Sequence, residues 1–265
     1  APAGIYFPGK GLRAVFLMNR IRMDINCDLG EGAGNDEALM PLISSANIAC
    51  GFHAGDTSTM LQTIRLARRH KVAIGAHPSY DDRNNFGRRN MNLGASEIFS
   101  LVRRQVQGMY NLCRAEGEHL HHVKPHGALY NQGAADPVIA ATIISAVKYV
   151  SPSLMIYGLS GSHLISEAGS AGLPAVAEAF MDPTYREDGT LTPRSEKGAL
   201  IDSIDSAIEQ ALSLALDRQV KTIDGTLVPL EVQTICIHGD GSQAVALAKA
   251  LSKGFRQHDI TIQSP

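Results

Sequence analysis

The stretch Ser45-Ala46-Asn47-Ile48-Ala49-Cys50-Gly51-Phe52-His53-Ala54-Gly55-Asp56 is a short apolar run that ends in a polar cluster with a histidine. Three further stretches, at 72–78, 121–127 and 234–240, have the same form. A parallel βα barrel places its chemistry in this way, because each buried strand is followed by ionisable side chains at its carboxyl end. Four such runs on one chain indicate a common pocket.

Strand-like and helix-like segments alternate along the whole chain from Met23 onward. We expect strands over 23–27, 46–50, 72–76, 120–124, 153–158, 174–179 and 233–237. Regular βα alternation favours a parallel sheet covered by helices. Seven units with polar strand ends favour a closed or nearly closed seven-stranded parallel barrel, in a single domain spanning 23–265. An open doubly wound sheet is the alternative.

The segments between these strands carry helix and loop signals. Asp56, Ser96 and Asp136 are predicted to cap helices, and a further helix is predicted from about Ser203 and another from about Ser242. Two long loops, 81–92 and 182–200, interrupt the alternation. Long ordered loops in compact domains are often functional, so we expect these two to cover the pocket.

Composition excludes several classes of partner. The net charge is −2, aromatic residues make up 5% of the 265 residues and Trp is absent, so neither nucleic acid nor a membrane surface is an expected partner. The four cysteines have no CxxC spacing, and three fall in predicted strands, where Cys acts as a small apolar residue. We therefore expect a reducing, cytoplasmic location.

Residues 1–22 fit none of the βα units. Their apolar run is short and no small-residue cleavage site follows it, so an export signal is the weaker interpretation. We expect an N-terminal extension outside the fold, with translation naturally starting at Met18 or Met23.

Asp28, His53 and His77 are the first candidate site residues. Alternation along the first strand puts Asp24, Asn26 and Asp28 on one face, which is the interior of a barrel. Buried acidic groups are costly unless they meet a metal, a cation or a substrate. His53 and His77 follow the next two strands, so together with Asp28 they could bind a divalent metal. The alternatives are a turn-capping Asp28 and structural histidines.

Lys124 and His126 form the strongest pair of candidates. Lys124 closes a buried strand, and Pro125 fixes the turn that presents His126. A buried lysine has either a depressed pKa or an anionic partner, and both suit a site that binds a carboxylate or stabilises an oxyanion. His121 and His122 point to opposite faces, so at most one of them faces the pocket.

The last strand and the second long loop add further candidates. His238 could act as a general acid or base, with Asp240 orienting it, although Asp240 could equally cap the last helix. Glu178 falls at the end of the sixth strand, and Arg194 is a candidate clamp for a carboxylate or phosphate. Arg88 and Arg89 are interpreted as residues of a solvated loop.

Common nucleotide and hydrolase motifs are absent from the sequence. There is no GxxxxGK[ST], no strand followed by GxGxxG, no GxSxG and no HExxH. The chain therefore offers no recognised loop for ATP.

Seven long motifs together resemble the LamB/YcsF family, and the resemblance spans nearly everything from Met23 to Ile262. The motifs are NCDLGEG at 26–32, SANIACGFHAGD at 45–56, AIGAHP at 73–78, FGRR at 86–89, HHVKPHGALYN at 121–131, DGTLTPR at 188–194 and TICIHGD at 234–240. The resemblance implies a seven-stranded βα barrel similar to the glycoside hydrolase/deacetylase superfamily. It also implies ATP-dependent hydrolytic ring opening of 5-oxoproline to L-glutamate, together with two other 5-oxoprolinase subunits, B and C.

The resemblance also implies which residues line the pocket, because they stand at positions that match the family's motifs. They are Asp28, His53, His77, Lys124, His126, Arg194, His238 and Asp240. We assign catalytic roles to Asp28, Lys124, His126, His238 and Asp240, and substrate binding to His53, His77, Glu178 and Arg194. Lys124 and Arg194 would hold the substrate carboxylate or phosphoryl oxygens. ATP is the expected co-substrate, and a divalent ion, either Mg²⁺ with ATP or an ion in the site, is a further expectation.

One departure from the family and two rival functions complete these expectations. Between Gly32 and Asp36 the chain has only three residues, where many relatives have a longer insert, so we assign no role to Glu31. The first rival is a stand-alone metal-dependent amide hydrolase in which Asp28, His53 and His77 hold the ion. The second is a non-catalytic protein that binds 5-oxoproline for its partners.

Overall fold

The computed structural model, which describes residues 21–193 and 196–265, is built around a closed barrel of seven parallel strands. Around the barrel these are β1 (Arg22–Leu29), β2 (Ser45–Ala49), β3 (Ala73–His77), β4 (Leu120–Val123), β5 (Met155–Leu159), β6 (Ala175–Phe180) and β9 (Thr234–Ile237). β9 pairs with both β6 and β1, which closes the cylinder. The predicted barrel is therefore confirmed, and the open sheet is excluded.

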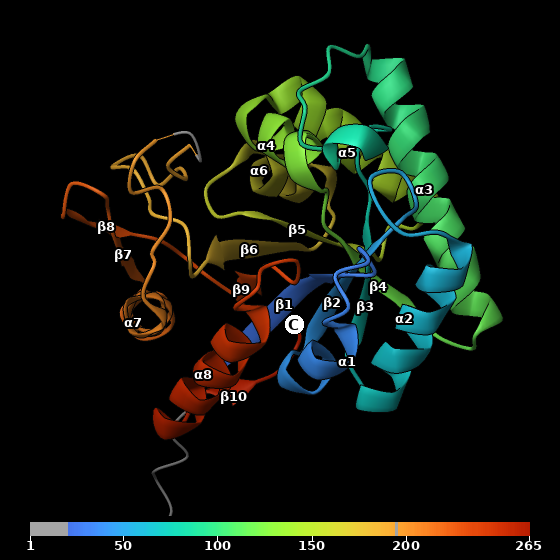
Figure 1. Cartoon of the computed structure of the whole chain (residues 1–265). Helices are drawn as coiled ribbons and strands as arrows, with labels where there is room; N and C mark the ends of the chain where they lie inside the picture. The colour runs from blue at the N-terminus through green and yellow to red at the C-terminus, as the bar shows by residue number, and fades with distance from the viewer. Residues whose placement is uncertain (1–20, 194–195) are drawn as a thin grey trace, which may run out of the picture.

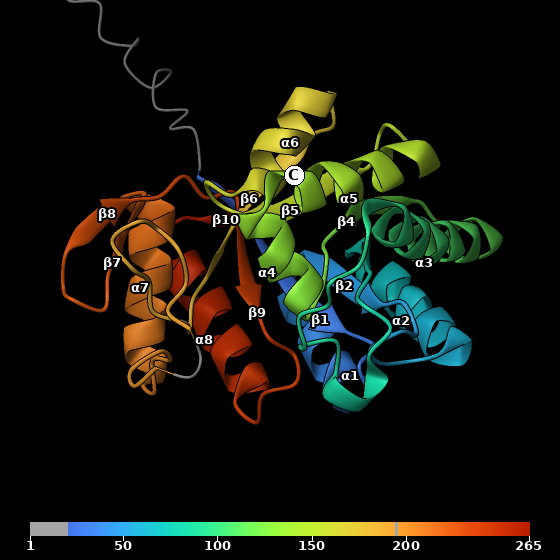
Figure 2. The ribbon, with the colours of Figure 1, turned by 90° about the horizontal axis from the view of Figure 1, so that it is seen from above.

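Helices surround the strands, as Figure 2 shows from above. They are α1 (Asp36–Leu39), α2 (Thr57–His70), α3 (Ala95–Ala115), α4 (Gly127–Ala135), α5 (Pro137–Val150), α6 (His163–Ala171), α7 (Ile204–Leu216) and α8 (Ala244–Gln257), with short 3₁₀ turns η1 (Met40–Leu42) and η2 (Arg83–Asn85). Their apolar faces, including Ile64, Val102 and Ile143, are buried in the core. Burying such stripes against the strands stabilises the fold.

Two of the three caps predicted for the first helices are confirmed. Asp56 accepts a hydrogen bond from the Thr59 N–H at 2.7 Å, and Asp136 accepts one from the Val138 N–H at 2.7 Å. The prediction of Ser96 is wrong, because α3 begins after Gly94, whose N–H donates to Glu97 Oε2 at 2.8 Å. A glutamate three residues into a helix reaches back to the cap in this way.

Three short strands lie outside the predicted pattern. β7 (Gln219–Lys221) and β8 (Leu227–Pro229) form an antiparallel hairpin that lies beside α7 and away from the barrel (Figure 1). β10 (Thr261–Ile262) runs parallel to the start of β1, with Arg22 beside Thr261. β1 thus begins one residue before Met23, and residues 1–20 of the predicted extension lie outside the described residues.

Within the described residues, no single helix is long and apolar enough to cross a membrane. The pair α4 and α5 meets the length and composition criterion together, but the two helices are bent by 119° at their junction. The apolar residues of α5, such as Ile143 and Val147, are buried in the core.

Candidate active site at the carboxyl end of the barrel

A pocket of about 1290 Å³ opens at the carboxyl ends of the strands. Its lining includes five predicted site residues from four different strand ends: Asp28, His77, Lys124, His126 and His238. Arg88 and Thr190, from the two long loops, also line it, so both loops border the pocket as expected. The predicted convergence of these side chains is therefore a feature of the structure.

Lys124 is buried in a cluster of negative and polar groups. Its ammonium lies 3.1 Å from Asp28 Oδ1 and 2.8 Å from Glu178 Oε1. Asn26 Oδ1 and Cys236 Sγ lie 3.1 and 3.0 Å away. An ammonium has three N–H groups, and these four acceptors use all of them. Lys124 therefore neutralises buried carboxylates from β1 and β6, and its predicted contact with a substrate carboxylate stays a prediction.

The charge states of Lys124 and Asp28 depend on each other. Burial alone would lower the pKa of Lys124, but Asp28, Cys236 and Glu178 raise it well above its usual range. Burial alone would raise the pKa of Asp28, but His77 and Lys124 hold it well below its usual range. Asn47 also donates to Asp28 Oδ1 at 2.8 Å. The floor of the pocket therefore carries an ionised carboxylate at neutral pH.

Glu178 lies deeper than predicted. It sits within β6, fully buried, and accepts hydrogen bonds from Asn26 Nδ2 at 2.8 Å and from Tyr130 Oη at 2.7 Å. Strand alternation turns Glu178 into the barrel interior, where these groups and Lys124 occupy its oxygens. Glu178 thus supports the pocket from below, and its predicted contact with substrate stays a prediction.

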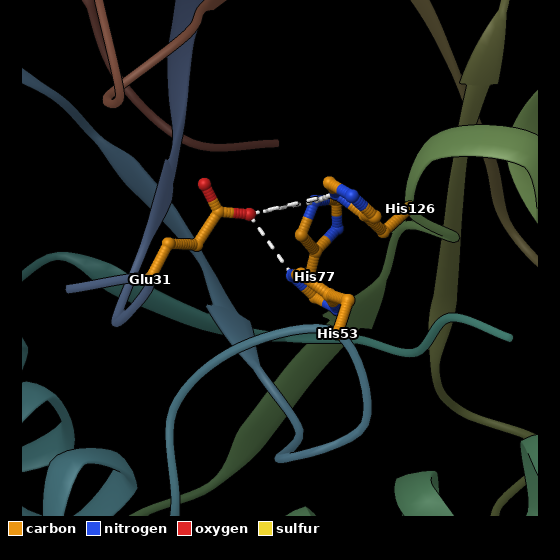
Figure 3. Close-up of side chains that lie close together, drawn as sticks. All are labelled: Glu31, His53, His77 and His126. Atoms are coloured by element: carbon orange, nitrogen blue, oxygen red, sulfur yellow. Dashed lines mark hydrogen bonds and ion pairs between the residues drawn. The ribbon is translucent and has the colours of Figure 1, made fainter. Parts of the chain in front are cut away.

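Glu31 joins three histidines at one side of the pocket (Figure 3). Its Oε1 lies 3.0 Å from His53 Nε2, 3.5 Å from His126 Nδ1 and 4.0 Å from His77 Nε2. The rings of His53 and His126 stack with centroids 3.8 Å apart. No role was predicted for Glu31 from the sequence, although its position directly after β1, between two glycines, was the available signal.

Burial shifts the pKa of His53, His126 and Glu31 toward the neutral form of each group. It lowers the pKa of His53 to about 3 and that of His126 to about 2, with His77 as the second cause in both cases. Burial, followed by the charge of Asp28, raises the pKa of Glu31 to about 7. His53 and His126 are therefore neutral rings with one lone pair each.

His238 faces a different acid from the one predicted. Its Nδ1 lies 3.6 Å from Asp182 Oδ1, and its ring stacks on Phe180 with centroids 5.5 Å apart. Burial would lower the pKa of His238, but Asp182 raises it overall. Asp240 instead pairs with Arg88 at 2.8 Å, in an exposed ion pair. Asp182, the first residue of the second long loop, is therefore the acid beside His238, and the orienting role of Asp240 stays a prediction.

A second buried polar layer lies below the pocket. His122 faces the interior, 2.8 Å from Asn47 Oδ1, and stacks on Tyr157. Asp24, 1% exposed, accepts hydrogen bonds from Ser44, Ser45 and Thr234. The inward face predicted for the first strand is thus confirmed. Arg194 lies outside the described residues.

Comparisons with known proteins agree with this architecture. The LamB/YcsF family model matches residues 23–265. The chain belongs to the LamB/YcsF family. The A-subunit of a 5-oxoprolinase from Bacillus cereus (strain Q1) is 47% identical over 249 residues, which are 92% of this chain and 98% of that protein.

Solved structures extend the family assignment. The crystal structure of a lactam utilization protein from Thermus thermophilus is 40% identical and has a TM-score of 0.87, covering 92% of this chain and all of that one. The catalytic domain of a peptidoglycan N-acetylglucosamine deacetylase from Eubacterium rectale is 10% identical with a TM-score of 0.51, covering 100% of this chain and 93% of that one. The second likeness shows a shared barrel fold and nothing of the chemistry.

Proposed function

We propose that this LamB/YcsF protein binds 5-oxoproline in the barrel pocket and opens its ring to L-glutamate, as one subunit of an ATP-dependent 5-oxoprolinase. One observation carries the proposal. The pocket floor holds Asp28, kept ionised by Lys124 at 3.1 Å, in a chain that is 47% identical to a named 5-oxoprolinase subunit. A buried carboxylate that stays ionised at a strand end is available to accept a proton from water.

Ring opening needs activation because a five-membered lactam is a resonance-stabilised amide. Transfer of a phosphoryl group from ATP to the amide oxygen makes the carbonyl carbon electrophilic. Water adds to that carbon, the C–N bond breaks, and the nitrogen takes up a proton. Hydrolysis of the remaining acyl phosphate by a second water releases phosphate and glutamate. ATP is thus consumed as a co-substrate.

The charge states of the pocket residues assign them to different proton transfers. Asp28 accepts a proton from the attacking water, and His238, whose pKa is raised by Asp182, donates a proton to the departing nitrogen. His126 lines the same pocket but is held neutral by burial, which suits an acceptor and not an acid. The raised pKa of His238 thus suits an acid, and the lowered pKa of Asp28 keeps that carboxylate ionised and free to accept a proton, at the cost of making it a weaker base.

Arg88 is the residue best placed for the substrate carboxylate. It lines the pocket, lies over the Phe86 ring at 4.9 Å and pairs with Asp240 at 2.8 Å, with 44% of its side chain exposed. An exposed ion pair contributes only about 0–1 kcal/mol, so a substrate carboxylate can replace Asp240. This assignment replaces Lys124 as the anion contact.

The partner subunits supply what the chain lacks. Its sequence has no recognised nucleotide loop, so we assign part of the ATP site, with its Mg²⁺, to subunits B and C. The word subunit in the name of the Bacillus cereus relative supports an assembly of several chains.

Reconstitution with subunits B and C tests this function. Glutamate formation and ADP release are measured with 5-oxoproline and ATP, with and without this chain. We expect both products only when all subunits are present. Glutamate formed by the isolated chain without ATP would support the metal-dependent amide hydrolase. Full turnover by B and C alone, with calorimetric binding of 5-oxoproline to this chain, would support the non-catalytic binding role.

A further inference from the structure

We propose that Glu31, His53, His77 and His126 bind one transition-metal ion of the zinc class, at a site that adjoins Asp28, whose Oδ2 lies 3.4 Å from His77 Nε2. The four side chains follow four consecutive barrel strands, β1 to β4, at their carboxyl ends. Figure 3 shows the three rings gathered opposite the Glu31 carboxylate. One ligand atom from each residue lies within 4.8 Å of all the others.

Hydrogen bonds fix the tautomer of two of the histidines. In each ring the bond is made by the outer nitrogen, the one that points away from the cluster. His77 Nδ1 lies 2.7 Å from the Lys124 carbonyl, and His126 Nε2 lies 2.8 Å from the Phe86 carbonyl. A carbonyl oxygen only accepts, so each outer nitrogen carries the hydrogen. In a neutral ring the inner nitrogen then has a lone pair. These inner atoms, His77 Nε2 and His126 Nδ1, lie 3.0 Å apart.

The tautomer of His53 is fixed by the hydroxyl group of Ser79. Its Nδ1 lies 2.9 Å from Ser79 Oγ, and this hydroxyl donates its own hydrogen to the Tyr80 carbonyl at 2.9 Å. Ser79 therefore accepts from His53 Nδ1–H, which leaves a lone pair on Nε2, 3.0 Å from Glu31 Oε1. Metal-binding histidines commonly donate their outer N–H to a second group in this way.

Four electron-pair donors thus surround one small region. The three rings are 95% or more buried, and the Glu31 side chain is 5% exposed, so water does little to screen their mutual repulsion. A cation at the centre removes this repulsion and satisfies all four donors at once.

The spacing of the donors matches a small tetrahedral ion. Bonds of about 2.0–2.1 Å to an ion of this class would separate tetrahedral donors by about 3.3–3.4 Å. The separations are 3.0 Å for His53–Glu31, 3.5 Å for His126–Glu31, 3.0 Å for His77–His126 and 4.0 Å for His77–Glu31, so His77 and Glu31 would move closer together on binding. Three nitrogens and one oxygen favour Zn²⁺, Co²⁺ or Ni²⁺ over Mg²⁺ or Ca²⁺.

The neighbouring group of Asp28, Cys236 and His238 is less suitable. Its donors are also within 4.8 Å of one another, but the Lys124 ammonium already lies 3.1 Å from Asp28 and 3.0 Å from Cys236. A second cation there would meet that charge. The ligands proposed here therefore differ from those expected from the sequence. Glu31 and His126 are added, and Asp28 is left out. An ion at the new site would supply a Lewis acid beside the pocket.

Direct hydrogen bonds within the cluster, between Glu31 and His53 at 3.0 Å and between His77 and His126 at 3.0 Å, are the alternative to a metal. Calorimetric titration of the chelator-stripped full chain with Zn²⁺, and visible absorption with Co²⁺, separate the two states. We expect one equivalent of Zn²⁺ with micromolar or tighter affinity, and Co²⁺ bands of tetrahedral intensity. Absence of stoichiometric binding, or a weak octahedral Co²⁺ spectrum, would overturn the metal site.

Variants locate the ion. We expect Glu31→Gln, which keeps the size of the side chain, and His53→Ala each to weaken Zn²⁺ binding at least tenfold. The control is His119→Ala, outside the cluster, which should keep wild-type affinity. Zn²⁺ should raise the melting temperature of the wild type and of His119→Ala, but not of Glu31→Gln. Wild-type affinity in both cluster variants would overturn the assignment. The readouts need no substrate or partner, so this result and that of the reconstitution are independent.

Discussion

The Lys124 ammonium lies 3.1 Å from Asp28 Oδ1, and the two residues are 2% and 7% exposed. One comes from the end of β4 and the other from β1, so the pair spans the barrel interior. Burying either charge alone carries a large desolvation cost, and the attraction between the two charges offsets part of it. The pair thus fixes a carboxylate, in its ionised form, at the floor of a pocket that would otherwise favour the neutral acid.

Removing Lys124 should therefore destabilise the fold. Lys124→Met leaves Asp28 and Glu178 buried without their cation, which should lower the free energy of unfolding by about 3–5 kcal/mol. Urea unfolding of the isolated chain measures this change. Adding Glu178→Gln removes one orphaned charge and should restore part of the loss. Equal stability of Lys124→Met and wild type would refute the buried ion cluster.

A methyl group at Gly75 should disturb the layer below the pocket. A Cβ there would lie 2.1 Å from His122 Nε2, which is itself bonded to Asn47. We expect Gly75→Ala to lower stability by about 1–3 kcal/mol, because the ring must leave its stack on Tyr157. Gly108→Ala is the control, since it has no neighbour within 4 Å, lies inside α3 and should gain about 0.5–1 kcal/mol. Thermal or urea unfolding that ranks the two variants the other way would contradict the packing.

The pH dependence of turnover should depend on Asp182. This carboxylate raises the pKa of His238, so the imidazolium persists to higher pH than in an ordinary histidine. A general acid works only when protonated. Asp182→Asn should lower the pKa of His238 and move the alkaline limb of the kcat/KM profile to lower pH in the reconstituted complex. An unmoved limb would exclude His238 as the acid. Asp224→Asn, at an exposed turn position, serves as the control.

Arg88 should determine substrate affinity more than turnover. If its guanidinium holds the 5-oxoproline carboxylate, Arg88→Ala should raise KM about tenfold or more while changing kcat less, because a ground-state contact is lost. Arg89→Ala is a matched control, as Arg89 is 65% exposed and faces Asp82 instead of Asp240. Steady-state kinetics of the complex checks both. Equal KM values for the two variants would count against this contact.

The sequence was a good guide where a local pattern determines structure. Each predicted strand is present, because its short apolar run is buried in the closed barrel. Ile48 in β2 and Ile74 in β3 are examples. Asp28, His77, Lys124, His126 and His238 meet because the strand ends of a parallel barrel share one rim. The family motifs reinforced this prediction.

The pairings across the rim could not be predicted from the sequence. Alternation puts Glu178 inside, but nothing local indicates that Lys124 would be saturated by Glu178, Asp28 and Cys236. Asp240 follows His238 by two residues, yet the acid facing that ring is Asp182, 56 positions earlier in the chain. Glu31 was missed because its backbone leaves β1 at Gly30, so strand alternation no longer predicts its direction.

Substitution of Asp28 by Asn tests the central claim most directly. The amide keeps the size of the side chain but cannot take a proton from water. In a complex assembled with subunits B and C, Asp28→Asn should lower 5-oxoproline-dependent glutamate formation and ATP hydrolysis by about 10²–10⁴-fold, while the assembly still forms. Turnover equal to that of the wild-type complex would contradict the placement of the ring-opening chemistry in this pocket.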